Sequence, residues 1–164
     1  MHNSSMSYAP MLFIHSWLRW IVLVLGALAV GRALNGVRTR RPFTPADEAS
    51  VRRFIMVLNI QLLAGLVLYL WASPFTTEAF HDMAGTMRNG PLRFFVVEHP
   101  FGMVVSLALA HIGRARVRRA ADSNARHRTA LLFFGLSLLV MLATIPWPAM
   151  PAGRPLFRGL VGAP

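Results

Sequence analysis

Residues 92–112 read LRFFVVEHPFGMVVSLALAHI, and this stretch decides the fold. A helix needs roughly 20 residues to cross about 30 Å of hydrocarbon. The apolar run from Pro100 to Ile112 has only 13 residues, which is too few. A membrane-spanning helix must therefore include the residues before Pro100, and it carries Glu98 and His99 below the membrane interface.

Proline at position 100 predicts a kink or a loosened turn at His99. Proline has no backbone N–H, and it disfavours helical geometry in the residue before it. Freed carbonyl groups and the Glu98 carboxylate are tolerated in a membrane only where they face protein or a water-filled cavity. Because a charge near the bilayer centre costs about 2.5–3.5 kcal/mol even on a mild scale, the sequence predicts a functional polar pocket at this level.

Three further segments are long and apolar enough to cross a membrane, over about residues 11–33, 51–71 and 129–147. The chain of 164 residues is 55% hydrophobic and 14% charged, with a mean hydropathy of +0.49, which argues against an ordinary soluble domain. Short connections favour antiparallel neighbours. We predict an all-α integral membrane protein, in which residues 1–164 form a single domain with an up-down bundle of four transmembrane helices.

The charges of the loops predict the orientation of this bundle. All 17 basic side chains are arginines, and most of them gather at the first and third loops rather than along one polar face, which argues against a nucleic-acid partner. In the second loop, residues 72–91, the charges nearly cancel. Since arginine-rich loops stay in the cytoplasm, we expect a multi-pass protein of the bacterial inner membrane with both termini outside, in the periplasm.

Two histidines are candidate ligands of a cofactor. His15 and Arg19 lie near the outer end of the first segment, and His99 lies near the outer end of the third. The first and third helices of an up-down bundle run in the same direction, so both imidazoles lie in one leaflet and can face each other across the core. In this arrangement they can bind the iron of a b-type haem from opposite sides. Alternatively the pocket binds a quinone, with Glu98 taking a proton and a histidine donating a hydrogen bond to a quinone oxygen.

The same residues also allow interpretations without a ligand. His15 is typical of the membrane interface as well, and His99 could donate to a carbonyl freed by Pro100. Glu98 could pair with Arg19 or Arg93. Elsewhere we expect His111 at the cytoplasmic headgroup level, Asn59 and Gln61 as interhelical contacts, and His2, His81 and His127 in solvent. The chain has no cysteine, which excludes disulfides and thiolate ligands.

Four strings of the sequence together resemble a family of small bacterial four-helix membrane proteins labelled cytochrome b-like. They are HSWLRW at residues 15–20, LLAGLVLY at 62–69, RFFVVEHP at 93–100 and IPW at 145–147. The resemblance covers about residues 13–147, and the RFF-x-x-EHP string is its most specific part. It implies a membrane electron-transfer component with ligands at His15 and His99. The chain departs from the family at Asn59, where members often carry a histidine.

These observations predict a membrane subunit of a bacterial electron-transfer or energy-converting complex. Its own contribution would be an outer-leaflet pocket built by His15, Arg19, Glu98 and His99, which holds haem b or a quinone. The alternative is an accessory structural subunit without a cofactor, whose buried charges pair internally and whose helices pack against other membrane subunits of a larger respiratory or photosynthetic complex. A free-standing enzyme is not expected, because the loops are too short to carry an active site.

Overall fold

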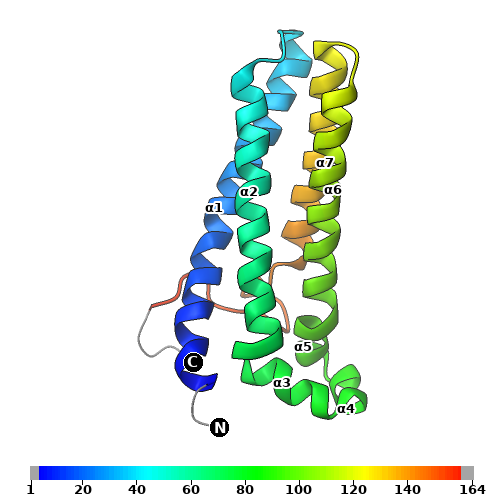
Figure 1. Ribbon diagram of the computed structural model, residues 1–164. Coiled ribbons are helices and arrows are strands. Elements are labelled where there is room, and N and C mark those ends of the chain that lie inside the picture. Colours follow the sequence, from blue (N-terminus) through cyan, green and yellow to red (C-terminus); the bar gives the residue numbers. More distant parts are fainter. Residues whose placement is uncertain (1–3, 160–164) are drawn as a thin grey trace.

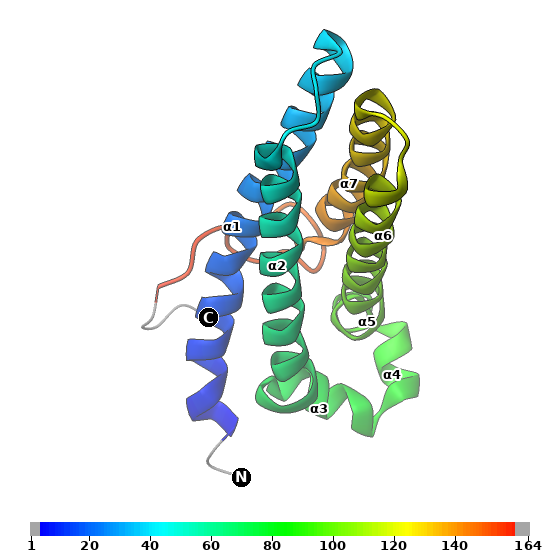
Figure 2. The same ribbon diagram turned by 45° about the horizontal axis from the view of Figure 1, so that its top comes forward.

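The computed structural model of the protein describes residues 4–159, and every regular element within them is a helix. Four long rods stand side by side (Figures 1 and 2). They are α1 (Ser4–Thr39), α2 (Pro45–Val67) continued by η1 (Leu68–Ala72), α6 (His99–Arg119) preceded by α5 (Gly90–Arg93) and η2 (Phe94–Glu98), and α7 (Ser123–Thr144). The predicted four-helix bundle is confirmed. The expectation for His2 lies outside the described residues.

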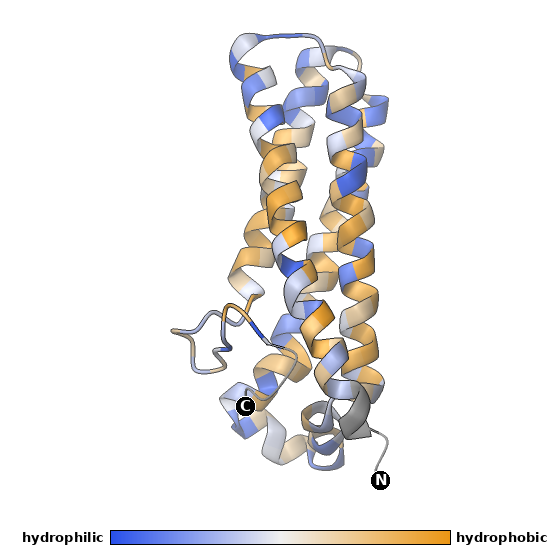
Figure 3. Ribbon diagram, turned by 90° about the vertical axis from the view of Figure 1, so that its left-hand side faces the viewer, coloured by the Kyte–Doolittle hydropathy of each residue, from blue (hydrophilic) through white to orange (hydrophobic). Residues whose placement is uncertain are grey.

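All four rods are long and apolar enough to cross a membrane, over Tyr8–Thr39, Pro45–Ala72, Gly90–Arg119 and Ser123–Thr144. Hydrophobic residues occupy the middle of the bundle, and hydrophilic residues gather toward its ends (Figure 3). The first three rods extend beyond the predicted segments, because hydropathy marks only the part of a helix that lies in lipid. The fourth ends at Thr144, three residues before the predicted end, because Pro146 and Pro148 cannot continue the helix.

The four rods form a square in which α1 lies diagonally opposite α6. Helix α1 packs against α2 and α7, and α6 packs against the same two helices. The centre is filled by large apolar side chains such as Phe54 and Phe134, whose rings meet edge to face with centroids 6.2 Å apart. The expected facing of the first and third membrane-spanning helices is therefore confirmed.

The arginine-rich end of the bundle is held by one buried carboxylate. Asp47, near the start of α2, is 2% exposed and bonds Arg32 at 2.9 Å and Arg41 at 2.6 Å. The same carboxylate accepts from the backbone N–H and the hydroxyl of Thr44, which caps the helix. These bonds fix the first turnaround and raise the pKa of Arg41 above its usual value, since the charged guanidinium is bonded to Asp47.

His127 is fully buried at this end of the bundle, so the expectation that it lies in solvent is wrong. Its ring packs 5.0 Å from the ring of Phe43, between centroids, and it occupies the space that a side chain at Gly36 would need. The absence of a side chain at residue 36 therefore admits the ring into the core. A contact between residues this far apart in sequence has no signal in local hydropathy.

The second loop is also more ordered than predicted, because local caps divide it into short helices. They are α3 (Pro74–His81), α4 (Met83–Arg88) and α5. The Asp82 carboxylate accepts from the N–H of Gly85, and the Asn89 side chain accepts from the N–H of Leu92. Helices of this length bury too few residues to create a visible hydrophobic period.

Helix α6 is preceded by the widened turn η2, and Pro100 explains why. The N–H of His99 donates to the carbonyl of Phe94, five residues earlier. In a regular helix the residue at position 100 would donate to the Val96 carbonyl, but proline has no N–H. That carbonyl instead accepts from the Tyr69 hydroxyl of η1 at 2.9 Å. The predicted loosened turn is confirmed, and its freed carbonyl ties η2 to η1.

Replacing Tyr69 by Phe should lower the free energy of unfolding by about 1–3 kcal/mol, since the Val96 carbonyl loses its partner in apolar surroundings. Thermal unfolding of the purified protein in detergent measures the loss. The matched control is the same change in a Pro100→Ala background, where the new backbone N–H can donate to Val96 and the loss should shrink. Equal losses in both backgrounds would show that the hydroxyl does not serve this carbonyl.

Candidate functional site

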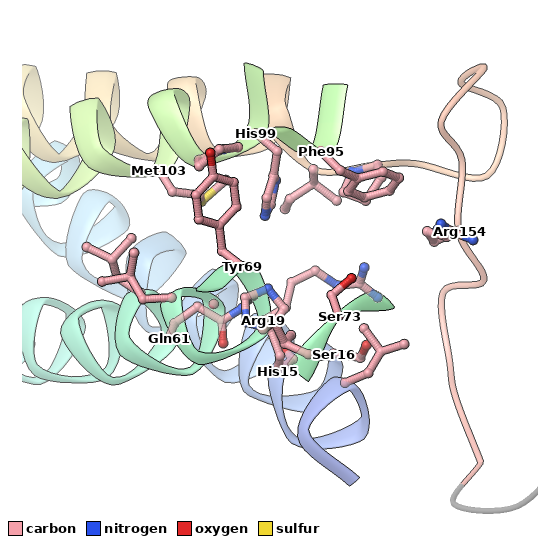
Figure 4. A pocket seen from close by; sticks show the side chains of 18 of the residues that line it. His15, Ser16, Arg19, Gln61, Tyr69, Ser73, Phe95, His99, Met103 and Arg154 are labelled. Atoms are coloured by element: carbon pink, nitrogen blue, oxygen red, sulfur yellow. Dashed lines mark hydrogen bonds between the residues drawn. The ribbon is translucent and has the colours of Figure 1, made fainter. Parts of the chain in front are cut away.

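A cavity of about 150 Å³ lies among the four rods, at the end of the bundle that carries α3 and α4. It is also lined by the C-terminal strap, our name for residues 146–159, which follows α7. Figure 4 shows His99 and Phe95 on one side of the space, and His15 and Gln61 on the other. Mostly apolar walls with a few polar groups are the usual composition of a ligand site.

His15 comes from α1 and is held by Gln61 of α2. The Gln61 amide nitrogen donates to the His15 carbonyl oxygen at 3.0 Å and lies 3.3 Å from His15 Nε2. Gly65, one turn later, makes room for the ring, because a side-chain carbon there would lie 3.1 Å from His15 Cε1. His15 Nδ1 is buried without a hydrogen-bond partner among the described residues. A buried nitrogen without a partner raises the free energy of the folded protein. A ligand that bonds to this nitrogen would remove that cost.

His99 comes from the first turn of α6 and is oriented by α7. Its Nδ1 lies 2.7 Å from the carbonyl oxygen of Thr144. A carbonyl only accepts, so Nδ1 carries the proton and Nε2 keeps its lone pair. Gly102 allows this contact, since any side chain there would collide with Thr144. This is the arrangement that a histidine adopts when its other nitrogen binds a metal.

The two imidazoles meet across the diagonal of the bundle. Their ring centroids are 6.2 Å apart, and the ring planes stand at 78° to each other. Phe94 and Phe95 of η2 flank the His99 ring at centroid distances of 6.1 and 6.5 Å. The sequence-predicted pair is therefore brought together, with apolar rings on one side and Gln61 on the other.

Arg19 lies one turn along α1 from His15 and also lines the cavity, as predicted. It is 9% exposed, and its Nη2 donates to the Leu156 carbonyl of the strap at 2.6 Å. The indole of Trp20 donates to the same carbonyl at 3.1 Å, and its ring stacks on Phe157 with centroids 5.5 Å apart. These contacts hold the strap against α1.

Glu98 does not line the cavity, contrary to the prediction. Its carboxylate pairs with Arg93 Nε at 2.8 Å, and its side chain is 39% exposed. Consecutive residues of a helix point about 100° apart. His99 therefore lines the cavity while Glu98, which is half-buried, does not, and the alternative interpretation of an ion pair with Arg93 is confirmed.

Other polar residues named from the sequence lie outside the cavity. His111 Nε2 is 3.3 Å from the Asn59 side-chain oxygen, on an exposed face between α6 and α2. Gln61, expected only as an interhelical contact, makes that contact at the site itself.

Three further residues line the cavity that the sequence analysis did not predict: Tyr69, Arg154 and Arg158. The face of α2 and η1 that buries residues 58, 61, 68 and 72 has helical spacing, and this period could have placed Gln61 inward.

Among the described residues, no group of three or more His, Asp or Glu side chains is placed to hold a metal ion, so the candidate donor set is the imidazole pair. We compared the chain with known proteins. No family model, no curated protein and no solved structure matches it.

Proposed function

We propose that the protein is a membrane electron-transfer component that holds a b-type haem between His15 and His99. The observation that carries this proposal is the meeting of the two imidazoles on the diagonal of the bundle, 6.2 Å apart between ring centroids. Imidazoles that bind one iron from opposite sides have centroids about 6 Å apart, since each metal–nitrogen bond is about 2 Å long. When bound, a haem supplies one-electron transfer, at a potential set by its axial ligands and surroundings.

The residues around each ring fit this role. The bond from His99 Nδ1 to Thr144 leaves Nε2 as the nitrogen available to a metal. At His15 the nitrogen without a hydrogen-bond partner among the described residues is Nδ1, so coordination through it would leave the 3.3 Å contact of Nε2 with Gln61 in place. Phe95 and Met103 supply apolar walls. The chain thus provides two candidate ligands and a largely apolar lining beside them.

A quinone is the second candidate, supported by the volume of the cavity. A space of about 150 Å³ is the size that accepts a single six-membered ring, whereas a haem is several times larger and would have to extend beyond it. Arg19 and Gln61 carry N–H groups that could donate to the oxygens of a quinone. Because Glu98 lies outside the cavity, a histidine would have to take the proton. A protein that binds a quinone has no haem band in its visible absorption spectrum. The spectrum of the purified protein therefore distinguishes the two candidates.

The third candidate function is that of an accessory subunit without a cofactor. Large apolar side chains are exposed along the bundle, for example Leu70, Trp71 and Phe101 at 66, 79 and 69%. Lipid contact accounts for such a surface in a membrane protein. Other membrane subunits would use the same surface, and deletion of the protein would then disrupt a larger complex without changing any spectrum of the purified chain.

The haem proposal predicts a Soret absorption band in the protein purified from bacterial membranes. His15→Ala and His99→Ala should each remove most of this band, because each deletes one of the two residues that would hold the iron. His111→Ala is the matched control and should leave the band unchanged, since His111 lies outside the cavity. A wild-type protein without a Soret band, even after reconstitution with haem, would rule out the haem proposal.

We also infer that the arginine-rich loops face the cytoplasm and that α3 and α4 lie outside it. The chain has no cysteine, so single cysteines can report this. In right-side-out spheroplasts, a membrane-impermeant maleimide should label Glu78→Cys at once, and Ala121→Cys only after permeabilisation, because the first lies in α3 and the second in an arginine-rich loop. The opposite labelling pattern would show that the protein has the inverted topology.

A further inference from the structure

We propose that Arg154 and Arg158 of the strap, with Arg19 of α1, form an anion subsite that binds the carboxylate groups at the edge of the cofactor. The inference rests on the proposed function and specifies the ligand chemically: a planar cofactor that carries carboxylates, as haem does in its two propionates. A quinone head group has no such anion. The subsite would therefore select between the two candidate ligands.

The first argument is charge. Arg19, Arg154 and Arg158 all line the same cavity. The chain has six acidic residues, and none of them lines it. Among the described residues, the ion pairs join Asp47 to Arg32 and Arg41, Glu48 to Arg114, and Glu98 to Arg93. Three guanidinium groups thus share a cavity without an acidic side chain among the described residues, and an anionic ligand would supply the missing counter-charge.

The second argument is the orientation of Arg154. Its guanidinium stacks over the ring of Phe95 at 4.9 Å and over that of Phe75 at 5.4 Å, measured to the ring centroids. The backbone N–H of Arg154 donates to the Pro146 carbonyl at 3.1 Å, which fixes the strap at this point. Aromatic stacking covers the faces of a guanidinium and leaves the N–H groups at its edge for a carboxylate. Arg154 is thus positioned between α3 and η2, beside the ring that flanks His99.

The third argument is an unpartnered donor. Arg19 is 9% exposed, and its Nε is buried without a hydrogen-bond partner among the described residues, although Nη2 is bonded to the strap. Burial lowers the pKa of the Arg158 guanidinium; the charge of Arg154 acts in the same direction, and Tyr8 opposes it. A carboxylate at this position would satisfy the donor and relieve the repulsion between the cations.

The test compares two iron porphyrins that differ only in charge: haem with free propionates, and its dimethyl ester. Each is titrated into the purified full-length apoprotein in detergent, and the Soret band measures binding. Wild type should bind the free acid at least about tenfold more tightly, which is the worth of one charge-assisted hydrogen bond. Arg154→Gln and Arg158→Gln should each weaken binding of the acid by about tenfold and leave binding of the ester unchanged. Arg88→Gln, an exposed arginine of α4, is the control for net charge.

Three outcomes would overturn the inference, and they are distinguishable. If wild type gives a Soret band with neither porphyrin, the proposed function fails and the subsite fails with it. If both porphyrins bind equally and the arginine variants change nothing, haem binding stands and the subsite is refuted. If both bind equally while the variants lose co-purifying anionic phospholipid, the three arginines hold a lipid phosphate instead. Retained helical circular dichroism in each variant confirms that it is folded.

Discussion

The structure depends on one constraint: polar groups that enter the membrane must find their partners inside the bundle. Pro100 illustrates this constraint, because it leaves the Val96 carbonyl, near the start of the third rod, without its usual backbone donor. The Tyr69 hydroxyl meets that carbonyl at 2.9 Å and links the second rod to the third. The turn that widens here places His99 toward the core, where the Thr144 carbonyl orients its ring at 2.7 Å.

The same constraint explains the asymmetry between the two ends of the bundle. At the arginine-rich end, Asp47 pairs with two arginines. At the other end, Glu98 pairs with Arg93 and does not line the cavity, which is lined by two imidazoles and three guanidinium groups. Cations gathered without an acidic side chain among the described residues are more typical of a binding site than of a scaffold.

Much of the architecture could be predicted from the sequence, because hydropathy fixes the spans and short loops fix the order of the helices. The shortness of the run from Pro100 to Ile112 also predicted that the third membrane-capable helix includes His99, as the span Gly90–Arg119 does. The prediction for Glu98 is wrong because neighbouring residues of a helix point about 100° apart, so Glu98 does not share the cavity with His99. His127 and the strap could not be foreseen. Their positions depend on Gly36 and on the Leu156 carbonyl, contacts between residues far apart in the chain.

The central claim is that the two imidazoles meet around a cofactor. The most direct measurement is an experimental structure of the protein purified from its native membrane, with density resolved between His15 and His99. The account predicts a flat density between the rings, with a nitrogen of each about 2 Å from a central metal. Rings in direct contact with each other, in a cavity filled by lipid or by side chains, would contradict it.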